Sequence, residues 1–170
     1  IGNAGGNVMN GGAGADIMDG KGGNDVYIVD DTADQVIEAA GQGYDAVYTS
    51  ISYALNDANE VETLSTLDWN STAAINLTGN SLANYLIGNA GVNLLNGGAG
   101  ADTMFGDAGN DEFRFGTEAG FDNVDGADGT DVLKATINAA RINLQSLANV
   151  EQITGAGFTD VQIVTAAGVS

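Results

Sequence analysis

The chain contains no cysteine, no proline and no histidine, and it has only four basic residues. Without cysteine no disulfide can form, and without proline a collagen helix is excluded despite the 26 glycines. The lack of histidine removes most catalytic triads and the commonest general base, and the lack of both histidine and cysteine argues against zinc and copper sites. No serine stands in a Gly-x-Ser-x-Gly setting, so we expect no enzymatic activity. No run of about 18 apolar residues is present, so we expect no membrane insertion.

Acidic residues dominate what charge there is. The 23 Asp and Glu residues outnumber the four basic residues and give a formal net charge of -19. Such a surface repels nucleic acid, which is therefore not an expected partner. Much of this charge lies at regularly repeated Asp positions. Unneutralised rows of carboxylates oppose compaction, whereas divalent cations would allow it, and a bound metal could replace the missing disulfides.

A nine-residue repeat is the most prominent feature of the sequence. Residues 11–19 (GGAGADIMD) and 97–105 (GGAGADTMF) show it in full, with glycine at positions one, two and four, Asp at six and an apolar residue at eight. A fixed short period is typical of a solenoid. If two-residue insertions are allowed at 38–39 and 115–116, eleven units follow the period. They begin at Gly2, Gly11, Gly20, Val29, Ala40, Gly79, Gly88, Gly97, Gly106, Thr117 and Gly126.

The sixth and eighth positions keep their chemistry in all eleven units. Every sixth residue is Asp or Asn, and every eighth residue is apolar. The last three residues of a unit alternate like a short strand, with the eighth side chain pointing inward. The sequence therefore predicts a core formed by Met9, Met18, Tyr27, Val36, Val47, Leu86, Leu95, Met104, Phe113, Val124 and Leu133.

A longer repeat divides the chain into two modules. Residues 1–25 are identical to residues 87–111 at eighteen of 25 positions, and Val61-Glu62-Thr63-Leu64 is echoed by Val150-Glu151-Gln152-Ile153. We expect a first module at 1–78 (array 2–48, wider strand coils 49–78) and a second at 79–170 (array 79–134, then C-terminal strand coils), stacked as one continuous solenoid. Outside the arrays, strands are expected at 46–51, 61–64, 74–77, 142–144, 150–153 and 161–164, although 138–147 could instead form a helical turn or two. Because the chain starts inside a repeat, we expect it to be part of a longer polypeptide.

The composition of the repeat suits calcium. Glycine allows a turn that points several carbonyl oxygens toward one spot, and the sixth-position Asp adds a carboxylate there. Oxygen ligands on a flexible loop match the six to eight ligands of calcium, whereas magnesium requires tighter octahedral geometry. The G-G-x-G-x-D-x-U-x pattern, complete at 11–19 and 97–105, resembles the calcium-binding repeat of the RTX (repeats-in-toxin) family.

This resemblance, over about residues 2–48 and 79–134, implies a fold and a set of sites. The fold is an all-β, right-handed parallel β-roll or β-solenoid, elongated and with very little helix, in which two units form one coil. Several calcium ions (Ca2+) would lie between stacked turns at the same edge, so sixth-position residues pair two units apart: Asn7 with Asp25, Asp16 with Asp34, Asn84 with Asp102, Asn93 with Asp111, Asp102 with Asp122, and Asp111 with Asp131. The expected ligands are Asn7, Gly12, Gly14, Asp16, Gly23, Asp25, Asp34, Asn84, Asn93, Gly98, Gly100, Asp102, Gly109, Asp111, Asp122 and Asp131.

Some units depart from the pattern. Asn in place of Asp keeps an oxygen ligand but loses the charge, which should weaken the sites at 7, 84 and 93. Lys21 replaces a glycine, and we expect its cation to point outward. The unit from Val29 has no glycine, so Asp34 is a poorer candidate than the other Asp residues.

The resemblance also implies a function. RTX segments stay unfolded inside the low-calcium cell, pass through a type I secretion channel and fold outside. We therefore expect a secreted or bacterial surface protein, in which this module is a folding trigger and a rigid spacer for other domains of the same polypeptide. The alternative is end-to-end self-assembly through open strand edges into a surface layer, filament, matrix or adhesin. Glycan binding is a weaker third hypothesis, since Trp69 is the only tryptophan and is expected to pack at a loop or solenoid edge.

Overall fold

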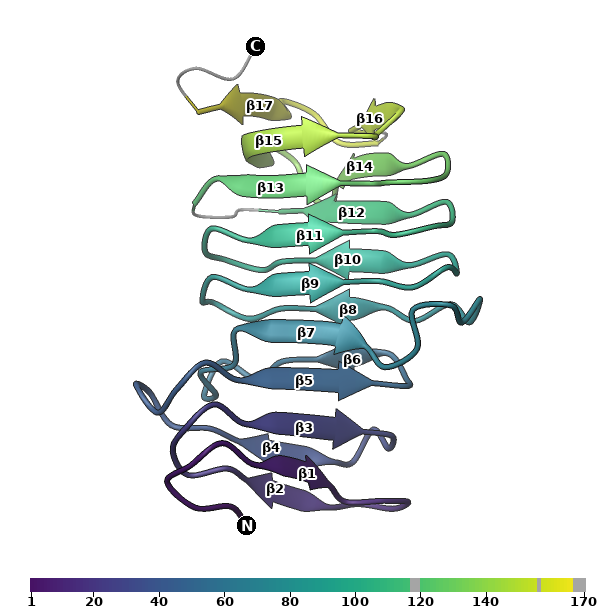
Figure 1. The fold of residues 1–170 in the computed structure, drawn as a ribbon. Helices are drawn as coiled ribbons and strands as arrows, with labels where there is room; N and C mark the ends of the chain where they lie inside the picture. Colours follow the sequence, from purple (N-terminus) through teal and green to yellow (C-terminus); the bar gives the residue numbers. More distant parts are fainter. Residues whose placement is uncertain (117–119, 156, 167–170) are drawn as a thin grey trace.

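Short parallel strands alternate between two facing layers in the computed structural model, which describes residues 1–116, 120–155 and 157–166 (Figure 1). The chain rises from the N-terminus at one end of the stack to the C-terminus at the other, through about eight turns of a β-solenoid. The described residues contain no helix, so none of them forms a helix that could cross a membrane. Thr117, with which one repeat unit begins, lies outside the described residues.

The odd-numbered strands form one layer. They make a single nine-stranded sheet in which every neighbouring pair is parallel. The strands within the nonapeptide units are short because a unit leaves only about three residues between its turns. The strands are β1 (Val8–Asn10), β3 (Val26–Val29), β5 (Ala46–Thr49), β7 (Thr63–Thr66), β9 (Tyr85–Ile87), β11 (Thr103–Phe105), β13 (Asp122–Asp125), β15 (Arg141–Ala148) and β17 (Gln162–Thr165).

The even-numbered strands form the facing layer, which is split into two sheets. β2 pairs only with β4, and the remaining six form a second parallel sheet. The strands are β2 (Ile17–Asp19), β4 (Gln35–Ile37), β6 (Tyr53–Ala54), β8 (Leu77–Thr78), β10 (Leu94–Asn96), β12 (Glu112–Phe115), β14 (Val132–Ala135) and β16 (Gln152–Thr154).

The core lies between the layers and is built as the repeat predicts. In register, Met104 lies between Leu86 and Val124 in one layer, and Leu95 lies beside Leu77 and Phe113 in the other. All eleven eighth-position side chains face this core, and every one except Met9 of the first coil is buried. The predicted all-β parallel solenoid and its core are thereby confirmed.

The stretches outside the nonapeptide arrays continue the same stack, with displaced strands. The predicted strand at 46–51 ends earlier, at Thr49, because the Thr49 hydroxyl donates to the Ile51 carbonyl and closes a turn. The strands expected at 61–64 and 74–77 begin two and three residues later than predicted. The helical alternative at 138–147 is wrong, because β15 pairs with both β13 and β17 and buries alternate side chains Ile142 and Leu144.

Candidate calcium sites at the two edges

Two rows of acidic and amide side chains follow the edges of the roll. We call the edge at which odd-numbered strands begin the odd edge, on the left of Figure 1, and the opposite one the even edge. Each sixth-position residue stands directly before a strand, or begins it in the case of Asp122, so each edge collects one such residue from every nonapeptide coil. The odd edge carries Asn7, Asp25, Asp45, Asn84, Asp102 and Asp122, and the even edge carries Asp16, Asp34, Asn93, Asp111 and Asp131.

The structure brings each of the six predicted pairs together. In every pair, the backbone N–H of the earlier residue donates to Oδ1 of the later carboxylate, one coil further along. The N···O distances run from 2.6 Å for Asn7 and Asp25 to 3.0 Å for Asp16 and Asp34. The carboxylates are therefore stacked in register, held by the backbone of the neighbouring coil. Their role as metal ligands remains a prediction.

Asp and Asn use this position differently. Oδ1 of Asn93 accepts from the backbone N–H of Asn89 in its own turn (2.8 Å), and its Nδ2 donates to the Ile75 carbonyl of the preceding coil (2.8 Å). Asn84 does the same with Asn80 and Val61. An Asn thus links two coils with protein partners alone and needs no cation, which supports the expectation that Asn sites bind calcium less well.

The Asp residues leave an oxygen without a partner. Asp25, Asp45, Asp111 and Asp131 are each at most 1 % exposed, and in each of them Oδ2 has no hydrogen-bond donor. A buried acceptor without a donor is expensive, and a buried carboxylate without a counter-ion more so. The ion pairs in the described part of the chain involve only Asp19 and Glu112 as acids, so none neutralises these rows. Unpartnered carboxylate oxygens are hard ligands, and this donor set fits calcium.

Asp34 is an exception among the buried Asp residues. Its Oδ1 accepts from the backbone of Asp16, and its Oδ2 accepts from the backbone N–H groups of Asp30 and Asp31 at 3.2 Å. Both oxygens therefore have protein donors, as in an ordinary Asp turn. This agrees with the absence of glycine from that unit and leaves Asp34 the poorest of the Asp candidates.

Burial raises the pKa of Asp side chains in the second array. Desolvation raises the pKa of Asp102 and of Asp111 to about 7 and that of Asp122 to about 6. The backbone N–H donated to each carboxylate offsets part of the rise, and the next carboxylate in the row adds to it for Asp102 and Asp111. Charge on these groups is thus unfavourable in the metal-free roll.

The first glycine of each unit makes room for the carboxylate. A Cβ built on Gly97 would overlap Oδ2 of Asp102, and one on Gly106 would overlap Oδ2 of Asp111. At Gly97 and Gly106, glycine is therefore required by contact with the carboxylate rather than by backbone angles. A larger residue at either position would displace the Asp side chain.

Glycines at the second and fourth positions serve the turn itself. The six predicted glycine ligands all have positive φ: Gly12 and Gly14 (81° and 108°) and Gly109 (131°) at the even edge, and Gly23 (102°), Gly98 (92°) and Gly100 (121°) at the odd edge. Left-handed backbone of this kind favours glycine.

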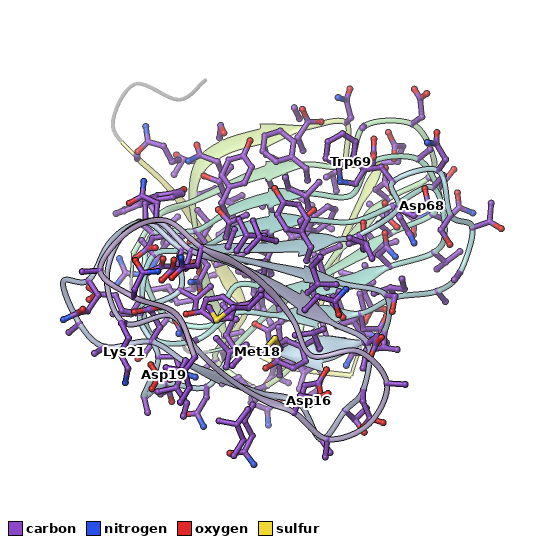
Figure 2. All side chains as sticks on the ribbon, turned by 60° about the horizontal axis from the view of Figure 1, so that its bottom comes forward. Asp16, Met18, Asp19, Lys21, Asp68 and Trp69 are labelled. Atoms are coloured by element: carbon purple, nitrogen blue, oxygen red, sulfur yellow. The ribbon has the colours of Figure 1, made fainter. Side chains whose placement is uncertain are left out.

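Lys21 adopts the same left-handed conformation, with φ of 81°, and its ammonium pairs with Asp19. Figure 2 shows Lys21 and Asp19 together at one side of the N-terminal end, with Met18 between the layers and Asp16 toward the other side. The Lys21 side chain is half-exposed and is engaged with Asp19, a ninth-position residue. Its cation therefore does not neutralise the sixth-position row.

Two glutamates extend the rows beyond the repeats. The backbone N–H of Asp45 donates to Glu62, and that of Asp131 donates to Glu151, both at 2.7 Å. They occupy the place of a sixth-position Asp in the next coil. The paired segments at 61–64 and 150–153 carried the signal for this, because a shared Val-Glu occurs at the same point of both modules. Sequence reasoning missed both residues because it looked only for Asp and Asn at these positions.

The chain matches one known family. The model of the RTX calcium-binding nonapeptide repeat (4 copies) matches residues 1–36 and 78–113, the segments whose turns carry the carboxylate rows. Comparison with curated proteins and with solved structures found no match. An RTX β-roll is a structural calcium-binding module, and the two arrays of this chain are similar to its nonapeptide repeat.

Proposed function

We propose that this chain folds when it binds calcium outside the cell, and that it then acts as a rigid spacer within a longer, type I-secreted protein. The observation that carries the proposal is the stacking of buried Asp carboxylates, with unpartnered Oδ2 atoms, along both edges. In the metal-free chain these rows oppose folding, because like charges are held one coil apart without cations.

Binding that occurs only in the folded state stabilises that state by RT ln(1 + [L]/Kd) per site. At a free calcium concentration 100 times Kd this amounts to about 2.7 kcal/mol per site. Several sites in one stack would make folding respond steeply to calcium. A chain that is unfolded at low intracellular calcium and folded at high external calcium is suited to export in the unfolded state.

The proposed ligands are the sixteen side chains and backbone groups predicted from the repeat, ranked by the contacts described above. Asp25, Asp111 and Asp131 come first because each has a buried oxygen without a donor. Asn84, Asn93 and Asp34 come last because protein donors and acceptors already satisfy them. We also propose the division into modules 1–78 and 79–170, which share one odd-strand sheet.

The test is a calcium titration of chain stripped with a chelator, followed by circular dichroism, with magnesium as the control. Calcium should produce β-structure where magnesium does not. Unchanged spectra throughout would overturn the proposal.

The second proposal is self-assembly, favoured by one observation. Backbone pairing between parallel strands joins each coil of the odd-strand sheet to the next. A second copy could extend the sheets by the same pairing. Light scattering during the same titration separates the two proposals, since assembly requires the mass to rise as the chain folds.

A further inference from the structure

Three buried carboxylates converge at the odd edge, two from the sixth-position row and one from the two-residue insertion at 38–39. Asp25 lies before β3, Glu38 follows β4, and Asp45 lies before β5, so they come from two turns stacked on the left of Figure 1. Their exposed fractions are 1 %, 2 % and 1 %. One oxygen from each lies within 4.8 Å of the others. Two oxygens bound to one calcium at 2.3–2.6 Å are at most about 5 Å apart, so one ion could contact all three.

The hydrogen bonds around this cluster leave oxygens free for a cation. Oδ1 of Asp25 accepts from the backbone of Asn7, and Oδ1 of Asp45 accepts from the backbone of Asp25. Oδ2 of Asp25 and Oδ2 of Asp45 are buried and have no donor. No Lys or Arg of the described chain forms an ion pair with any of the three carboxylates.

Glu38 is held in place by neighbours that are not acidic. Its Oε2 accepts from the Tyr27 hydroxyl, and its Oε1 accepts from the backbone N–H of Ala39. Its own backbone N–H donates to Oδ1 of Asn59 at 3.3 Å, while Nδ2 of Asn59 donates to the Val36 carbonyl at 2.6 Å. The carboxylate is thus positioned before any ion arrives. Each Glu38 oxygen accepts one hydrogen bond, whereas Oδ2 of Asp34 accepts two, so Glu38 keeps lone pairs for an ion.

The two-residue insertion at 38–39 explains why a glutamate fits here. The residue after β2 is Gly20, and a Cβ on Gly20 would overlap Oδ2 of Asp25 and the Tyr27 hydroxyl. Glu38 occupies the corresponding place after β4, but Asp45 follows it by seven residues rather than five. The longer turn gives the Glu38 side chain the space that a regular unit reserves for its own Asp.

We propose that Asp25, Glu38 and Asp45 form an interior calcium site whose protein ligands are side-chain carboxylates, with Tyr27 positioning Glu38. This rests on the proposed calcium-binding function and adds Glu38, a ligand that the nonapeptide pattern does not contain and that lies outside the matched segments. Three carboxylates supply three negative charges, so a divalent cation leaves only one uncompensated. The site joins the turn before β3 to the turn before β5, near the end of the first nonapeptide array.

The first experiment counts bound calcium by equilibrium dialysis of wild type, Glu38→Gln and Glu60→Gln over a range of free calcium. Glu60 contacts the backbone of Gly41 and acts electrostatically on Asp45 without belonging to the cluster, so it matches the change in charge. Glu38→Gln should bind one ion fewer at the lowest free calcium that saturates wild type, with at least a tenfold weaker affinity at that site. Glu60→Gln should keep the full number.

A second measurement does not depend on the folding of Glu38→Gln. Terbium substitutes for calcium and emits when a nearby tyrosine is excited, so the wild-type emission should fall in Tyr27→Phe, which keeps all three carboxylates. If wild type binds calcium, equal ion counts in wild type and Glu38→Gln, or equal terbium emission in wild type and Tyr27→Phe, would overturn this site alone. If wild type binds no calcium, the proposed function itself fails.

Discussion

Replacing Asp111 by Asn should have opposite effects on the metal-free and the calcium-bound roll. Asn keeps the Oδ1 that accepts from the backbone of Asn93 at 2.8 Å, and it removes the charge from the buried, unpartnered Oδ2. Asn93 occupies the same position one coil earlier, so an amide fits this turn. The substitution therefore separates the charge of the carboxylate from its shape.

The size of the effect follows from burial. The pKa of Asp111 is raised from 3.8 to about 7. A rise of about three pH units, at about 1.4 kcal/mol per unit, corresponds to about 4 kcal/mol against the ionised form above pH 7. The new amide N–H2 also needs partners, which reduces the benefit. We expect Asp111→Asn to stabilise the metal-free chain by about 1–3 kcal/mol and to weaken calcium binding at least tenfold, or about 1.4 kcal/mol.

Circular dichroism in chelator at pH 7.5 measures the first effect, as a gain in residual β-structure, and urea unfolding in saturating calcium measures the second, as a loss of stability. Asp68→Asn is the matched control, because Asp68 lies in an exposed turn and accepts from the backbone of Asn70. It should change neither value appreciably. A loss of residual β-structure in Asp111→Asn, together with unchanged stability in calcium, would refute the reasoning.

Three further predictions concern pH, the turn glycines and the core. Burial raises the pKa of Asp102, Asp111 and Asp122, so between about pH 4 and pH 7 the metal-free fold holds protons that the unfolded chain releases. The stability of the metal-free fold is therefore greatest below about pH 4 and falls as pH rises to about 7. A melting temperature in chelator that is higher at pH 8 than at pH 5 would contradict this. Gly97→Ala should displace the Asp102 carboxylate and weaken calcium binding. Gly12 has φ of 81° and open space around a new Cβ, so Gly12→Ala should only lower stability, by about 1–2 kcal/mol. Calcium titration measures the first effect and urea unfolding measures the second. Leu95→Ala, at a fully buried position, should reduce the free energy of unfolding in calcium by about 2–5 kcal/mol, and a loss under 1 kcal/mol would mean that the core is not packed as described.

The features predicted correctly from the sequence are those that depend on the nine-residue period. Strand placement, the inward eighth residue and the pairing of sixth positions all follow from two units per coil, and the structure has all three in both arrays. Position one was understood only as a turn glycine. That Gly97 must be glycine because the Asp102 carboxylate lies against it could not be read from spacing.

Where the period fails, sequence reasoning missed functional residues. The insertion at 38–39 was treated as a shift of register, although Glu38 places a buried carboxylate between Asp25 and Asp45. Nothing local marks this residue, since the side chains that surround its carboxylate and its backbone N–H are 7–21 positions away. Outside the arrays no period fixed the strand ends, so side-chain contacts such as that of Thr49 determined them.

The most direct test of the whole account is a calcium titration of the chelator-stripped chain, with circular dichroism and light scattering recorded together. The account predicts a transition from coil to β-structure driven by calcium and not by magnesium. Constant mass during the transition would favour the spacer, and rising mass would favour assembly. A stripped chain that is already fully folded at pH 7.5 and does not respond to calcium would contradict the central claim, because the carboxylate rows would then need no cation.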